Sequence, residues 1–162
     1  MASIETPTAP TPEFLETSSE ADVRLAERHA PILSVSASHF DHAMLRRMID
    51  QSRWKIVAAY NCREALHKVR YVGALVVICE DQLPDGDWKD LLEVARALEE
   101  PPFLIVTSGL ADEKLWSEVM NLGGFDVLVK PFREEEVRNV LSSVWIQQVR
   151  PGRRVSTLRA AS

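Results

Sequence analysis

Polar side chains that can do chemistry stand at the ends of several short apolar runs of the sequence. Glu80 and Asp81 follow one run, Thr107 ends a second, Lys130 follows a third, and Ser36 ends an earlier one. A lysine beside a carboxylate forms an ion pair, and a lysine with a hydroxyl group can bind an anion such as phosphate. Carboxylate oxygens are also ligands that Mg²⁺ prefers. The available chemistry therefore depends on which of these side chains the fold brings together.

The apolar runs alternate with segments of helical periodicity. Strands are expected over residues 32–36, 55–60, 74–79, 103–107 and 127–129. Helices are expected over residues 38–49, 61–71, 112–122 and 133–148, with one more that ends at residue 98. Ser38, Asn61 and Asp112 stand where helix N-caps are needed, and Gly123-Gly124 closes the helix that Asp112 opens. The first helix is expected to bury Ala43, Met44, Met48 and Ile49.

Five strands that alternate with helices predict an α/β fold, with a doubly wound parallel sheet covered on both faces. In such folds functional residues gather beyond the carboxyl ends of the strands, where the strand order reverses. The residues at those ends are Ser36-Ala37, Glu80-Asp81, Thr107-Ser108 and Lys130-Pro131. The pattern therefore predicts one candidate site at that edge of the sheet.

Three segments at these strand ends resemble response-regulator receiver domains of two-component signalling. The run from Val76 to Asp87 is similar to the strand and loop that carry the family's phosphoacceptor aspartate, four residues before the loop proline, and that position is Glu80 here. Thr107 stands at the family's hydroxyl position, and Lys130-Pro131 matches its lysine and proline. The resemblance covers residues 31–148 and implies a flavodoxin-like sheet of five strands in the order 2-1-3-4-5.

The sequence departs from the receiver pattern at several positions. The resemblance implies two metal-binding acids after the first strand, where this chain has Ser36 and Ala37. The phosphoacceptor is Glu80 in place of aspartate, and Val127 stands where the family has a switching aromatic residue. Trp88 occupies a loop position that is typically glycine. These changes predict a degenerate member, a pseudo-receiver.

The loss of the first-strand acids bears directly on phosphoryl transfer. Transfer to a carboxylate needs a divalent cation that neutralises the phosphate and positions the donor. Ser36 and Ala37 offer only one neutral hydroxyl and a methyl group. Asp81 should point to the other side of its strand from Glu80, because strand residues alternate. We therefore expect no cofactor, no metal centre, and weak or absent Mg²⁺ binding.

Glu80 and Lys130 each have two interpretations. The longer side chain of Glu80 would reach toward Thr107 and Lys130, where its carboxylate could imitate part of a phosphoryl group. Alternatively, Glu80 is only an ion-pair partner of Lys130, at a position no longer selected for chemistry. A possible interaction face comprises Trp116, Met120 and Val127, and Trp116 and Met120 are offset from an expected core stripe of Leu115, Val119 and Leu122.

The composition favours a soluble module and gives no sign of a nucleic-acid-binding surface, a metal site or an enzyme active site. Apolar residues make up 46% of the 162 residues, and the net charge of −5 argues against nucleic acid as the main partner. The two cysteines and four histidines show no metal-ligand spacing. No phosphate-binding glycine loop or catalytic triad is present, so we expect no enzyme. Without a signal-peptide pattern or a long apolar run, a cytoplasmic location is expected.

Both ends of the chain differ from its middle. Residues 1–30 are expected to form a disordered extension with a possible short helix at 20–29, residues 31–149 the receiver-like domain, and residues 150–162 a basic disordered tail. Residues 1–30 hold six acids and two bases, whereas residues 150–162 hold four arginines and no acid. A tail of this length cannot form a helix-turn-helix, which argues against a DNA-binding regulator.

These observations together predict a single-domain signalling module in two-component or phosphorelay transduction. It would bind a protein partner, such as a histidine kinase or another regulator, without itself being phosphorylated. The alternative is a genuine phosphoacceptor that uses Glu80 or Asp81. The sequence leaves the partner and the oligomeric state open.

Overall fold

The computed structural model describes residues 30–149. The expectations for the amino-terminal extension and the basic tail therefore lie outside the described residues. Within residues 30–149, no helix is both long enough and apolar enough to cross a membrane.

Five parallel strands form one sheet in the order β2-β1-β3-β6-β7. The strands are β1 (Ala30–Val35), β2 (Trp54–Ala59), β3 (Val76–Glu80), β6 (Phe103–Ser108) and β7 (Asp126–Val129). Counted along the chain without the short ribbon described below, this order is 2-1-3-4-5, so the predicted topology is confirmed. The sequence is nearly all apolar along β3 because that central strand is covered on both faces.

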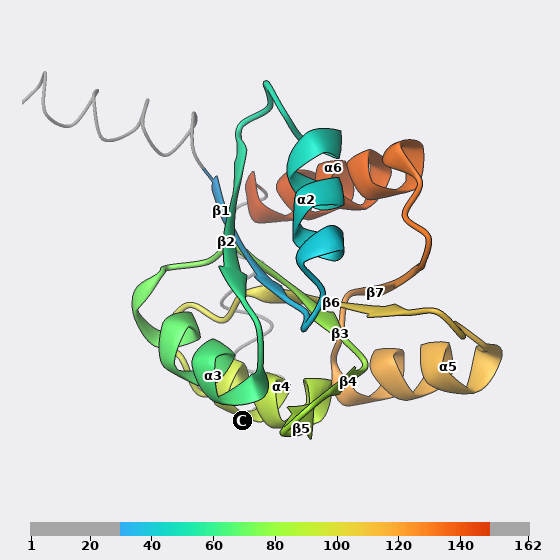
Figure 1. The fold of residues 1–162 in the computed structure, drawn as a ribbon. Coiled ribbons are helices and arrows are strands. Elements are labelled where there is room, and N and C mark those ends of the chain that lie inside the picture. The colour runs from blue at the N-terminus through green and yellow to red at the C-terminus, as the bar shows by residue number, and fades with distance from the viewer. Residues whose placement is uncertain (1–29, 150–162) are drawn as a thin grey trace, which may run out of the picture.

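Helices cover both faces of the sheet (Figure 1). They are α2 (His39–Met48), α3 (Cys62–Tyr71), α4 (Trp88–Arg96), α5 (Glu113–Leu122) and α6 (Glu134–Val149). In Figure 1, α2 and α6 lie above the sheet, and α3, α4 and α5 lie below it. One core cluster, which includes Ile32, Leu45 and Leu141, fills the α2/α6 side, and a second, which includes Leu33, Leu91 and Val119, fills the other side.

Side-chain caps explain where the helices begin. The side chain of Ser38 accepts a hydrogen bond from Asp41 N, that of Asn61 from Glu64 N, and that of Asp112 from Leu115 N. Each bond satisfies a backbone donor that a helix start would otherwise leave unpaired. The N-caps predicted from the sequence are confirmed at these positions.

The loop after β3 contains a structure that the sequence did not predict. Gln82–Leu83 (β4) and Gly86–Asp87 (β5) pair as a small antiparallel ribbon around the turn at Pro84 and Asp85. The carboxylate of Asp85 accepts hydrogen bonds from Arg63 N and Cys62 N at the start of α3, and these bonds lower its pKa. The ribbon therefore ties the loop that follows Glu80 to the first turn of a neighbouring helix.

Trp88 and the two cysteines belong to the core below the sheet. Trp88 is only 2% exposed and packs in the same cluster as both cysteines. Cys62 and Cys79 are buried free thiols, and burial raises the pKa of each. A buried thiol held in its neutral form is unreactive, so neither cysteine contributes to a site.

Candidate functional site

Lys130 lies at the centre of a polar cluster at the carboxyl edge of the sheet. Its Nζ is 2.5 Å from Glu80 Oε1 and 2.8 Å from Asp41 Oδ2. Glu80 ends β3, Lys130 follows β7, and Asp41 comes from the first turn of α2. The pairing of Glu80 with Lys130 that the sequence suggested is present, and Asp41 is a second partner that it did not suggest.

The hydroxyl of Ser36 joins the same two carboxylates from the other side. Ser36 Oγ lies 2.7 Å from Asp41 Oδ2 and 3.1 Å from Glu80 Oε2, and it accepts a hydrogen bond from Ser38 N. A hydroxyl has one proton to donate, so the shorter contact to Asp41 is the stronger bond. We call Ser36, Asp41, Glu80 and Lys130 the carboxylate–lysine cluster.

Strand alternation decides which of the strand-end residues join the cluster. Glu80 pairs in register with Thr107, which is buried beside it. Asp81 is the next residue, and its Oδ2 accepts a hydrogen bond from Ser108 Oγ at 3.0 Å. Asp81 and Ser108 thus form a separate pair, as expected where successive side chains leave a strand on opposite faces.

The cluster places one ammonium between two carboxylates. The side chains of Lys130, Asp41 and Glu80 are 20%, 12% and 23% exposed, so little water reaches them. Burial acts to lower the pKa of Lys130, but the hydrogen bonds to Asp41 and Glu80 outweigh it and raise that pKa above its ordinary value. The ammonium therefore stays charged and attracts both carboxylates, although its single positive charge cannot neutralise the two of them.

Beneath the cluster, His42 holds the end of β1 in place. The ring is fully buried, with Nε2 2.9 Å from the Ser36 carbonyl oxygen and Nδ1 2.8 Å from Ser34 Oγ. A carbonyl oxygen can only accept, so Nε2 carries the proton and Nδ1 accepts from the Ser34 hydroxyl. The neutral imidazole thus fixes the backbone of Ser36, whose side chain belongs to the cluster.

His42 is expected to make the fold less stable in mild acid. Burial lowers the pKa of His42, outweighing the hydrogen bond to Ser36 that raises it. The neutral imidazole contributes fully to the free energy of unfolding above the unfolded-state pKa of about 6.5. This contribution declines as the pH falls from there toward the folded-state pKa. Between about pH 7.5 and about pH 5.5, the free energy of unfolding measured in urea should decline less for His42→Gln than for wild type. His67→Gln, which removes an exposed histidine from α3, should keep the wild-type decline; equal declines in all three proteins would refute the role of His42.

The expected burial pattern of α2 is partly wrong, which is why the sequence missed Asp41 and His42. Ala43 is exposed and Met44 is only partly buried, whereas Asp41 and His42 are buried. Helical periodicity assigns polar residues to the solvent face, and that rule fails where polar side chains meet partners inside the fold. An acid three residues after the helix cap was the available signal, but it has the same appearance as ordinary helix-start chemistry.

The cluster does not fit the divalent cation that a receiver domain would imply. The cation would need oxygen ligands from Asp41, Glu80 and Asp81, but an ammonium already bridges the first two and Ser108 binds the third. Ala37 is exposed at the strand end and offers no ligand. Within residues 30–149, no group of three or more acidic, histidine or cysteine side chains could hold a metal ion.

The residues of the possible interaction face differ in their exposure. Trp116 and Met120 are 50% and 40% exposed on α5. Val127 is partly buried against the core, and Val129 is the exposed apolar residue of β7. Leu122, which was expected in the core stripe, is also exposed, so that expectation was wrong.

Comparisons with known proteins agree with this architecture. The family model of the response regulator receiver domain matches residues 32–142. The chemotaxis protein CheY of Thermotoga maritima is 25% identical over 114 residues, which cover 70% of this chain and 95% of that protein. A protein-glutamate methylesterase/protein-glutamine glutaminase of Paramagnetospirillum magneticum is 32% identical over 102 residues, which cover 62% of this chain and only 28% of that protein.

Solved structures show the same fold. A two-component response regulator from Clostridium difficile superposes with a TM-score of 0.67 at 20% identity, over 75% of this chain and 99% of that one. The non-phosphorylated HemR receiver domain from Leptospira biflexa gives a TM-score of 0.65 at 24% identity, over 75% of this chain and 98% of that one. With the family model matching most of residues 30–149, this chain belongs to the response regulator receiver domain family of two-component signalling.

Proposed function

We propose that this receiver domain signals by binding a partner protein, without phosphoryl transfer to its own strand-end acids. The observation that carries the proposal is the position of Lys130, with its Nζ between the carboxylates of Glu80 and Asp41. A lysine that is already paired with two internal carboxylates has little attraction left for an incoming phosphoryl group. The cluster also fails the fit to a divalent cation, which phosphoryl transfer to a carboxylate needs.

Glu80 would then act as a permanent, partial substitute for a phosphorylated side chain. Its carboxylate reaches Lys130 Nζ through Oε1 and Ser36 Oγ through Oε2. It carries a charge of about −1, whereas a phosphoryl group carries about −1.5 to −2. The imitation is therefore weaker than the modification, but it does not depend on an upstream kinase.

Exposed apolar side chains supply the surface for such a partner. Trp116 and Met120 lie one turn apart on α5, and Val129 is exposed on the neighbouring β7. Aromatic and methionine side chains are enriched at protein interfaces, where they supply large contact areas. A histidine kinase or another regulator is the class of partner that fits a receiver domain.

The proposal is tested with the full chain as bait in a pull-down from its native host. The bait is incubated with Mg²⁺ and a small phosphodonor or with buffer alone, and its intact mass is measured before use. We expect no added phosphoryl group and the same co-purifying proteins under both conditions. Trp116→Ala should lose those proteins, since truncating an interface tryptophan commonly costs about 2 kcal/mol or more of binding.

Two results would contradict the proposal. Stoichiometric phosphorylation of Glu80 or Asp81 would favour a genuine phosphoacceptor. Recovery of the same proteins by Trp116→Ala would exclude the α5 face as the contact. Arg70→Ala is a suitable matched control for the bait, because it changes an exposed side chain of α3. That helix packs on β2, at the opposite edge of the sheet from β7.

A further inference from the structure

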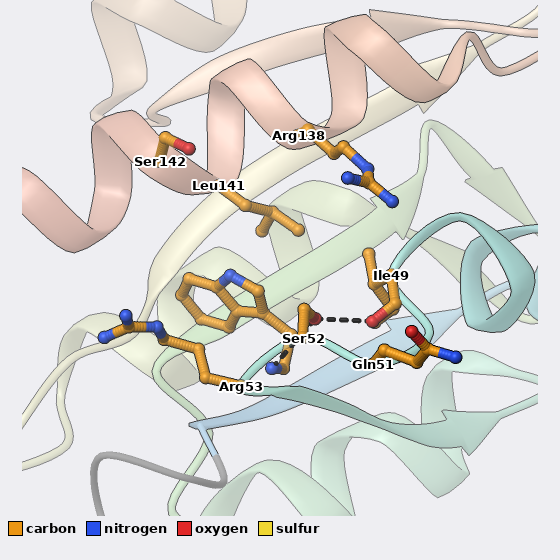
Figure 2. Close-up of a pocket in the computed structure, with 8 residues that line it drawn as sticks. Ile49, Gln51, Ser52, Arg53, Arg138, Leu141 and Ser142 are labelled. Atoms are coloured by element: carbon orange, nitrogen blue, oxygen red, sulfur yellow. Dashed lines mark hydrogen bonds between the residues drawn. The ribbon is translucent and has the colours of Figure 1, made fainter.

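A pocket flanked by two arginines lies at the amino end of the sheet, remote from the carboxylate–lysine cluster. It lies between the loop from α2 to β2 and the side of α6 and has a volume of about 420 Å³. Figure 2 shows Leu141 in its middle, with Arg53 and Arg138 on opposite sides. Trp54 also lines the pocket. We call this site the arginine pocket; its other lining residues include Ser52 and Ser142.

Arg53 is held in place with its hydrogen-bond donors still available. Its guanidinium carbon lies 4.1 Å from the centroid of the Trp145 ring, and that ring meets Trp54 edge-on. Stacking uses the flat face of a guanidinium and leaves the N–H groups at its edge free. Among residues 30–149, no acidic side chain forms an ion pair with Arg53. The arrangement is suited to receive a carboxylate.

The opposite side of the pocket is anchored and also basic. Arg138 donates Nε to the Met48 carbonyl oxygen at 3.2 Å and pairs with Glu134 at 2.9 Å, which leaves further N–H groups exposed. Arg46 and Arg47 are exposed in the last turn of α2, which leads into the loop of the pocket. Asp50 in the loop and Glu134 on α6 offset two of these four arginines, so the region keeps a net positive charge in a protein whose net charge is −5.

The chain enters the described structure next to this pocket, and the residues that precede that point in the sequence are acidic. Residues 1–29 contain six acidic and two basic residues. They join the sheet at Ala30, which pairs with Trp54 and whose N donates to the Arg53 carbonyl oxygen at 2.7 Å. Glu27 is three residues from Ala30, a chain length of at most about 11 Å.

We propose that the arginine pocket binds this chain's own acidic segment, residues 1–29, through carboxylates such as those of Asp22 and Glu27. The covalent link gives this segment an effective concentration of order millimolar at the pocket, which a free acidic peptide would have to match. Residues 150–162 carry four arginines and no acid, so the same charges repel them. The bound segment would connect the loop before β2 to α6. This proposal does not rest on the proposed signalling function.

The test is paramagnetic relaxation in the full chain with a nitroxide on Ala21→Cys. Cys62 and Cys79 are buried and do not compete for the label. We expect the amide signals of Gln51, Ser52 and Ser142 to weaken severalfold, while those at the opposite edge of the sheet, such as Leu110, keep their intensity. Arg53→Glu should remove the effect at the pocket. Arg70→Glu makes the same charge change at an exposed position on α3 and should leave it unchanged.

Three results would overturn the proposal. The first is a uniform weakening of the amide signals over the whole domain, and the second is an equal effect of Arg53→Glu and Arg70→Glu on the signals at the pocket. The third is weakening of those signals that persists when the nitroxide and the isotope label are on different molecules. The last would assign the pocket to the segment of a second copy. None of these results bears on phosphoryl transfer or on the α5 face, so the two proposals fail independently.

Discussion

Lys130→Met is expected to lower the free energy of unfolding at pH 7 by about 2–4 kcal/mol, just below the typical range for breaking a buried ion pair because some water reaches the site. Methionine keeps most of the aliphatic stem, so the change removes the charge and its hydrogen bonds with little loss of packing. The carboxylates of Asp41 and Glu80 then share the Ser36 hydroxyl without a cation between them. Urea unfolding monitored by circular dichroism measures the loss.

Two variants separate the cluster from ordinary surface electrostatics. Lys89→Met breaks the exposed pair between Lys89 and Glu118 and should change the free energy of unfolding far less than Lys130→Met does. Adding Glu80→Gln to Lys130→Met should recover part of the loss, because it removes one of the two uncompensated charges. If the effects of the two substitutions simply add, the side chains are not coupled.

The alkaline limb of the stability curve gives an independent check on Lys130. Its pKa is raised in the folded state, so its charge stabilises the fold at every pH below the unfolded-state pKa of about 10.4. This contribution is lost as the pH rises through the folded-state pKa. Above about pH 10.4, the free energy of unfolding should therefore fall more steeply with pH for wild type than for Lys130→Met. If the two proteins give parallel plots of that free energy against pH, the charge of Lys130 does not stabilise the fold.

The fold could be predicted from the sequence because its determinants are local and periodic. Apolar runs of strand length, caps such as Ser38 and Asp112, and the glycines after α5 each specify an element within a few residues. The parallel order then follows from alternation and from the resemblance. The β4–β5 ribbon was missed because two-residue strands carry no periodic signal.

The candidate site could be predicted only where the sheet itself positions the side chain. Glu80 and Lys130 both stand at strand ends, and parallel strands bring those ends to one edge. Asp41 reaches the same place from a helix, and its direction depends on how α2 packs on the sheet. The arginine pocket was not predicted at all, because Arg53 and Trp145 are far apart in the sequence and meet only through tertiary packing.

Gly124→Ala is expected to destabilise the fold by about 1–3 kcal/mol or more, because no space exists for a methyl group there. A Cβ at this position would lie 3.0 Å from the Val119 carbonyl oxygen and closer still to the Val119 side chain, which is fully buried. The Gly124 amide also donates to that carbonyl at 2.8 Å, so any shift that relieves the clash weakens the end of α5. The turn leads directly into β7, the strand that ends at Lys130.

Gly109→Ala is the matched control, since a Cβ added there would meet no atom within 4 Å. It should change stability by about 0.5 kcal/mol or less in either direction. Thermal and urea unfolding of both variants measure the difference between the two glycines. A Gly124→Ala protein as stable as Gly109→Ala would mean that the α5–β7 turn can move away from Val119 at little cost. The position of Lys130 would then not depend on the tight packing of that turn.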